Sequence, residues 1–172
     1  MKMKPFLLAF TIVSLAIGFN SCKKAAETKD EMEATFELSG DQAIADNLTE
    51  DANDLFMQVA VENNVAGNNF GPDPTPTNDF IPCATVTITP GGFPKTIVID
   101  FGTSCTFNGV TRSGKINIVL TDSVRRTGSQ AVMTFDNYYV NLFKVEGTYT
   151  WTNTSSVGTR SWSRKTENGK IT

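Results

Sequence analysis

Residues 83–101 read CATVTITPGGFPKTIVIDF, and this stretch decides the fold. Two runs rich in β-branched residues flank a short segment that contains two glycines and two prolines, which is typical of two strands and a turn. Placing Ile88 opposite Ile97 and Val86 opposite Ile99 puts the apolar side chains of both runs on one face. The sequence therefore predicts an antiparallel hairpin with one buried face.

The same two-residue period continues after this hairpin. Alternating apolar positions predict strands over residues 115–121, 131–139 and 143–153, and a weaker pattern surrounds Trp162. We therefore expect residues 81–172 to form an antiparallel β-sheet meander. Asn168-Gly169 is typical of a turn, and the three residues after it look like a strand that has just begun, so we expect the domain to be cut short at Thr172.

A different period precedes the sheet. Ser39 with Gln42 has the spacing of a capping box, and apolar side chains then recur at three- and four-residue steps. We expect an amphipathic helix over residues 39–64, a charged tether over 22–38 and a linker rich in Pro, Gly and Asn over 65–80. The predicted fold class is mainly β (α+β), with the helix packed against the sheet.

Charge is unevenly distributed along the chain. The net charge of −3 is small, but residues 25–80 hold thirteen acids and one base, whereas residues 81–172 hold five acids and ten bases. The modest negative total argues against nucleic acid as a partner. We interpret the asymmetry as two parts of one fold that attract each other; the alternative is that the basic part binds an anionic glycan or a lipid headgroup.

The first residues have the pattern of an export signal. Lys2 and Lys4 precede the apolar run FLLAFTIVSLAIGF at residues 6–19, which is too short to span a bilayer. We therefore expect residues 1–21 to be a signal peptide. Cys83 and Cys105 would then reach an oxidising compartment, where the hairpin register brings them close together, so we expect them to form a disulfide.

The junction FNSCKK at residues 19–24 resembles the lipobox of bacterial lipoproteins, although Phe19 stands where leucine is commonest. The resemblance implies that the thiol of Cys22 is acylated and that membrane lipid is a partner, because several acyl chains give stable anchoring. The strings RSGKI, TFDNYYVN and KVEGT in residues 112–148 look like those of a group of uncharacterised envelope lipoproteins of Gram-negative bacteria. This resemblance implies a location in the cell envelope, at the outer membrane, and leaves open which side the domain faces.

The sequence contains no histidine, which removes the usual catalytic triads and histidine metal sites. We expect no cofactor and no metal. A binding or structural module of the envelope is the favoured function, with a glycan or an envelope protein as partner. The alternative is a small carbohydrate-active enzyme that uses two carboxylates from among Asp100, Asp136 and Glu146.

Aromatic and basic residues gather in the last strands. Tyr138, Tyr139, Trp162 and Arg160 are the candidate ligand-binding residues, because aromatic rings with polar tips are used to contact sugars and proteins. The competing interpretation is that these rings pack in the core. Tyr149 and Trp151 share a face with the apolar Val145, so we expect their rings to pack in the core.

Overall fold

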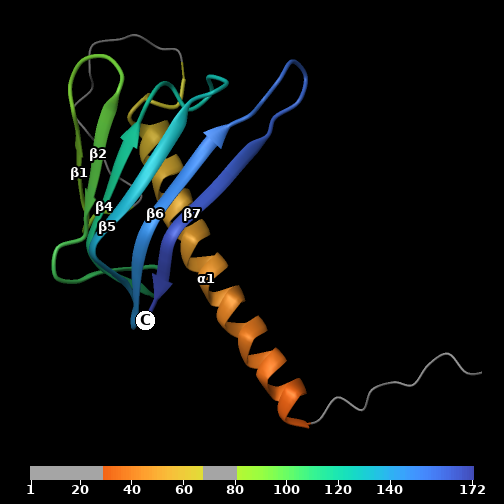
Figure 1. Cartoon of the computed structure of the whole chain (residues 1–172). Coiled ribbons are helices and arrows are strands. Elements are labelled where there is room, and N and C mark those ends of the chain that lie inside the picture. Colours follow the sequence, from red (N-terminus) through yellow and green to blue (C-terminus); the bar gives the residue numbers. More distant parts are fainter. Residues whose placement is uncertain (1–28, 68–80) are drawn as a thin grey trace, which may run out of the picture. The chain divides into compact units, whose positions relative to one another are not determined.

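The computed structural model describes residues 29–67 and 81–172, with side chains from Ser39 onward. The expected signal peptide, the acylation site Cys22, the first part of the tether and most of the linker lie outside the described residues. The elements are α1 (Lys29–Glu62), β1 (Thr85–Ile88), β2 (Lys95–Asp100), β3 (Cys105–Phe107), β4 (Val110–Leu120), β5 (Gln130–Val140), β6 (Phe143–Asn153) and β7 (Trp162–Ile171) (Figure 1).

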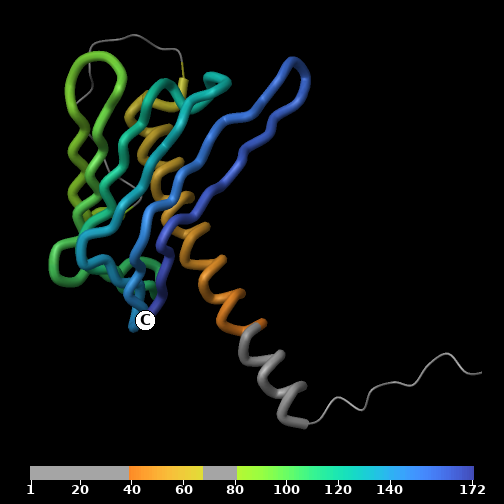
Figure 2. Tube along the Cα trace, viewed as in Figure 1, coloured from red at the N-terminus to blue at the C-terminus, as the bar shows by residue number. Residues whose placement is uncertain are grey.

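The chain divides into two units, residues 1–41 and residues 42–172. The described part of the first unit is the beginning of α1. In the second unit, seven strands form one antiparallel sheet in the order β1-β2-β4-β5-β6-β7, with β3 paired to β4 (Figure 2). The predicted fold class is confirmed: it is a sequential antiparallel meander with one helix packed against it.

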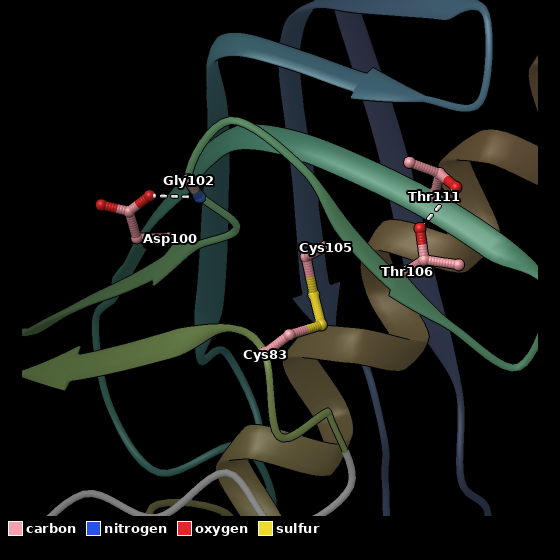
Figure 3. Close-up of a disulfide and its surroundings, with 6 residues drawn as sticks. All are labelled: Cys83, Asp100, Gly102, Cys105, Thr106 and Thr111. Carbon is pink, nitrogen blue, oxygen red and sulfur yellow. Dashed lines mark hydrogen bonds between the residues drawn. A yellow bond between two sulfur atoms is a disulfide. The ribbon is translucent and has the colours of Figure 1, made fainter.

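The first hairpin has the predicted register. Val86 lies opposite Ile99, and Ile88 lies opposite Ile97. Cys83 and Cys105 form a disulfide with their Cα atoms 5.4 Å apart, which confirms the expected bond. Figure 3 shows this bridge beside the turn where the Asp100 carboxylate accepts a hydrogen bond from the Gly102 amide, at 2.9 Å.

The core lies between the second half of α1 and one face of the sheet. α1 contributes Leu48, Ala52, Leu55, Phe56 and Val59. The sheet contributes the alternate residues that point towards the helix, among them Ile97, Ile99, Ile116, Ile118 and Met133, each fully buried. Threonines such as Thr87, Thr96 and Thr134 occupy the other face and are exposed. The sheet therefore has one apolar and one polar face, which is what alternation produces.

The acidic and basic parts of the chain meet within the second unit, as expected. Arg112 on β4 makes a double hydrogen bond with Asp51 on α1, and Arg112 Nε lies 3.1 Å from the Asp51 Oδ2 atom. Arg164 on β7 pairs with Glu50 at 2.8 Å and with Asp46 at 3.2 Å. Acids of the helix thus neutralise bases of the sheet.

The helix begins at Lys29 rather than at Ser39, so the capping-box prediction was wrong, and residues 29–38 of the expected tether are helical. Those residues read KDEMEATFEL, and most of them are strong helix formers, so the helix continues through Ser39 and Gly40. At its other end, Val65 and Ala66 were expected in the linker, but they are buried and their amides donate to the carbonyl of Ala60.

The strands that contain Gly114 and Gly169 are longer than expected. β4 begins at Val110 rather than at residue 115, and the expected turn at Asn168-Gly169 lies inside the continuous strand β7. Asn168 has φ 52°, and the β6–β7 register shifts beside it, so this dipeptide forms a bulge. A bulge needs the same left-handed backbone as a turn, which explains the error.

Candidate functional site

The four candidate ligand-binding residues lie in three different places. Tyr138 is fully buried beside Phe101 and Phe135, at ring-centroid distances of 5.6 Å and 5.5 Å, so its assignment to ligand binding was wrong. Tyr139, the next residue along β5, is 37% exposed on the other face of the sheet. Arg160 and Trp162 lie together in the lining of one pocket.

This pocket has a volume of about 610 Å³, which is within the ~300–1,000 Å³ typical of small-molecule sites. Three segments line it: the C-terminal end of α1, the β4–β5 loop and the β6–β7 hairpin. The lining includes the side chains of Met57, Val61, Arg125, Thr127, Arg160 and Trp162.

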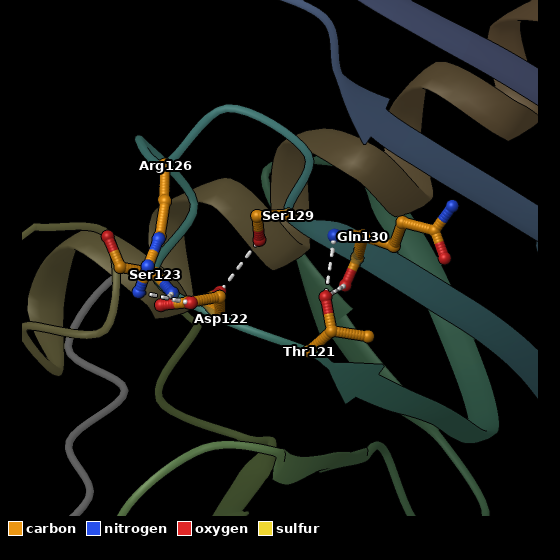
Figure 4. Close-up of polar contacts among 6 residues, drawn as sticks. All are labelled: Thr121, Asp122, Ser123, Arg126, Ser129 and Gln130. Carbon is orange, nitrogen blue, oxygen red and sulfur yellow. Dashed lines mark hydrogen bonds and ion pairs between the residues drawn. The ribbon is translucent and has the colours of Figure 1, made fainter.

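The β4–β5 loop forms one wall, and its own polar groups hold it in place (Figure 4). The carboxylate of Asp122 accepts hydrogen bonds from the Ser123 amide and from the Arg126 guanidinium, at 2.7 Å and 2.8 Å. The backbone carbonyl of Asp122 accepts a hydrogen bond from the Ser129 hydroxyl at 2.8 Å. The loop is therefore fixed at both ends, and Arg125 lies between the anchored residues.

The β6–β7 hairpin forms the second wall and is joined to the first. The buried Asn153 donates from Nδ2 to the carbonyl of Val124 at 2.9 Å and accepts from the Ser155 amide at 2.9 Å. Thr127 donates to the carbonyl of Ser155 at 2.8 Å. The bonds from Asn153 to Val124 and from Thr127 to Ser155 cross between the two loops, so they tie the two walls to each other.

The end of α1 closes the third side. Amides of the β4–β5 loop donate to carbonyls just after the helix, from Val124 to Val65 at 3.5 Å and from Arg125 to Ala66 at 3.3 Å. Met57 and Val61 provide an apolar patch there, and Val61 is 61% exposed. Figure 1 shows the end of α1 near the loop that joins β4 and β5.

The charge of the lining is positive. Arg125 and Arg160 are both exposed, and neither makes an ion pair or a side-chain hydrogen bond with any described residue. The described lining contains no aspartate or glutamate. Trp162, 43% exposed, adds an aromatic surface, and Ser156 and Thr159 add hydroxyl groups. Such a surface can bind an oxyanion and stack against a planar or sugar ring.

The three carboxylates considered for catalysis lie on the sheet beside lysines. Lys115 is 2.9 Å from Asp100 and pairs in register with Asp136, and Lys144 is 2.7 Å from Glu146. The hydrogen bond from Lys115 lowers the pKa of Asp100, and that from Lys144 lowers the pKa of Glu146. A general acid for glycoside hydrolysis needs a raised pKa, so the lowered pKa values of Asp100 and Glu146 do not suit that role.

Sequence reasoning found Arg160 and Trp162 but missed Arg125 and the α1 residues of the pocket. One local signal could have found Arg125. Asp122 stands four residues before Arg126 and can pair with it, which leaves the neighbouring Arg125 without an acid nearby. Met57 and Val61 gave no such signal, because their place in the pocket depends on how the helix packs on the sheet.

A scan against protein-family models, a search of curated proteins and a search of solved structures each found no match. No helix among residues 29–67 and 81–172 is long and apolar enough to cross a membrane. Within those same residues, no group of three or more histidine, cysteine, aspartate or glutamate side chains could hold a metal ion.

Proposed function

We propose that this chain is a lipid-anchored protein of the bacterial cell envelope, at the outer membrane. In this proposal its β domain, which is the sheet of residues 81–172 with the second half of α1 packed on it, binds a saccharide. The anchor rests on the lipobox-like sequence at Cys22, which implies acylation. The binding role rests on one observation: a preorganised pocket of about 610 Å³ with an exposed tryptophan and several hydroxyl groups in its lining. Ring stacking on the indole and hydrogen bonds to hydroxyls are the usual means of holding a sugar.

Binding is tested on a glycan array with the purified acylated protein in detergent. Trp162→Ala should remove the signal, because it removes the aromatic surface of the pocket. Tyr139→Ala is the matched control, since Tyr139 is similarly exposed but lies outside the pocket. Circular dichroism checks that both variants fold. If no glycan binds, or if both variants lose binding equally, the saccharide site is wrong.

The anchor is tested separately by growth with labelled palmitate. Label should enter the native chain and be lost in Cys22→Ser, because acylation needs the thiol. Cys83→Ser is the matched control, since Cys83 forms the disulfide and carries no acyl chain in this proposal. Label that persists in Cys22→Ser would contradict the anchor and leave the pocket proposal to its own test.

A further inference from the structure

We infer that the pocket selects an anionic saccharide, one that carries a carboxylate, sulfate or phosphate group, and that Arg125 and Arg160 bind this group. The inference rests on the proposed saccharide-binding function and names the class of sugar.

Most basic side chains of the β domain already have an acidic partner. Six of them make ion pairs within 4.0 Å, and these are Arg112, Lys115, Arg126, Lys144, Arg164 and Lys165. Arg125 and Arg160 differ in that no described acid pairs with them, although both lie in the same pocket. Two guanidinium groups in one concave site concentrate positive potential there, because the surrounding protein screens charge less than water does.

Arginine is well suited to oxyanions. Its planar guanidinium donates two parallel hydrogen bonds to a carboxylate, sulfate or phosphate, and these charge-assisted bonds are stronger than neutral ones. A small inorganic anion would occupy little of a pocket of about 610 Å³. The rest of the lining indicates what else the ligand carries: Trp162 suits the face of a pyranose ring, and the hydroxyls of Ser156 and Thr159 suit its hydroxyl groups.

A flat anionic membrane surface fits these observations less well. Polybasic membrane contacts use about four to eight clustered lysines or arginines, whereas this pocket offers two arginines inside a concavity. A discrete ligand that enters the pocket can meet both the arginines and the indole. We therefore favour a soluble or polymer-borne acidic sugar over lipid headgroups.

Isothermal titration of the full chain with an oligogalacturonate, its carboxyl-reduced neutral counterpart and a phosphorylated hexose tests the inference. At least one anionic probe should bind more tightly than the neutral one, and its affinity should fall as salt increases. Arg125→Ala and Arg160→Ala should each weaken that binding by about tenfold or more. The carboxylate and phosphate probes show which oxyanion the site prefers.

Matched controls remove the same charge outside the pocket. Lys115→Ala removes an ammonium that pairs with Asp100, and Lys165→Ala removes an ammonium that pairs with Glu167. Both controls should keep the anionic affinity within about twofold, because neither side chain lines the pocket. Urea unfolding of Arg125→Ala should match that of the native chain; a loss of stability without a loss of binding would assign Arg125 to the fold and overturn the inference.

The outcomes separate this inference from the proposed function. If the neutral probe binds as tightly as the anionic probes and only Trp162→Ala abolishes binding, the anionic class is wrong and the saccharide site stands. If none of these probes binds and the glycan array is also blank, both are wrong. Binding confined to vesicles with phosphatidylglycerol, with none to any sugar, would overturn both in favour of a membrane surface.

Discussion

Asp51→Ala should destabilise the β domain by about 3 kcal/mol. Asp51 on α1 accepts both hydrogen bonds from Arg112 on β4, whose side chain is only 8% exposed. The hydroxyl of Tyr138, fully buried on β5, donates to the same carboxylate at 3.4 Å. Burial alone would lower the pKa of Arg112, but the hydrogen bonds to Asp51 raise it. The arginine therefore stays charged and needs its partner.

The magnitude follows from what the substitution leaves behind. Removing one member of a buried ion pair costs roughly 3–5 kcal/mol, because an unpaired charge stays in the interior. The side chain of Asp51 is 28% exposed, so water can reach part of the vacated site, and we expect the lower end of that range. With a urea m-value of about 2 kcal/mol/M, the unfolding midpoint should fall by about 1.5 M.

Urea unfolding of the full chain, followed by circular dichroism, measures this shift. Glu167→Ala is the matched control, because its pair with Lys165 is exposed (51% and 68%) and should contribute less than about 1 kcal/mol. The double variant Asp51→Ala/Arg112→Met should recover part of the loss, since no buried charge is left without a partner. If Asp51→Ala behaves like Glu167→Ala, the ion pair does not hold α1 to the sheet.

Three further predictions concern other parts of the fold. In urea unfolding, Gly102→Ala should lower the free energy of unfolding by ~1 kcal/mol, and Gly114→Ala should lower it by several times as much. Both glycines have positive φ, but only at Gly114 would a Cβ lie 2.0 Å from a backbone carbonyl oxygen. Equal losses would contradict the close approach. Burial raises the pKa of Tyr138, so the unfolded chain ionises first, and stability should fall as pH rises above ~10. Tyr138→Phe should remove part of that alkaline loss in unfolding measured against pH, and an unchanged loss would contradict it. Replacing Cys83 and Cys105 by alanine, 22 positions apart, should lower the free energy of unfolding by roughly 3 kcal/mol; an unchanged denaturation midpoint would show that the bridge contributes nothing.

The register of the first hairpin could be predicted because the sheet has one buried face. A shift of one residue would turn Val86 and Ile88 outward together with their partners, so the apolar pattern allows one alignment. That alignment also brought Cys83 towards Cys105. The pairing of acidic helix and basic sheet followed from composition in the same way, because opposite charges in a single small domain have few other partners.

The assignment of Tyr138 failed for a reason that no local pattern contains. Alternation from Met133 through Phe135 puts residue 138 on the outer face of β5. The structure inserts a bulge at Asn137, with φ 45°, so the pattern shifts by one residue, and Tyr138 turns inward. The bulge is possible because Gly114 on β4 has no side chain where the carbonyl of Asn137 lies. Gly114 and Asn137, which are far apart in sequence, together determine which face of the sheet Tyr138 occupies.

Part of the pocket lining could be predicted from the sequence, and part depends on contacts between distant segments. Arg160 and Trp162 could be found because they are two residues apart and of types that bind ligands. Arg125 reaches the same pocket only because Asn153 and Thr127 tie the β4–β5 loop to the β6–β7 hairpin. The helix acids that pair with the sheet are Asp46, Glu50 and Asp51, which all precede Met57. From α1 the pocket lining receives Met57 and Val61 and no acid, although Glu62 ends the helix next to Val61. Arg125 and Arg160 therefore lie in the pocket with no acid of the described residues as a partner, and they can meet an anion there.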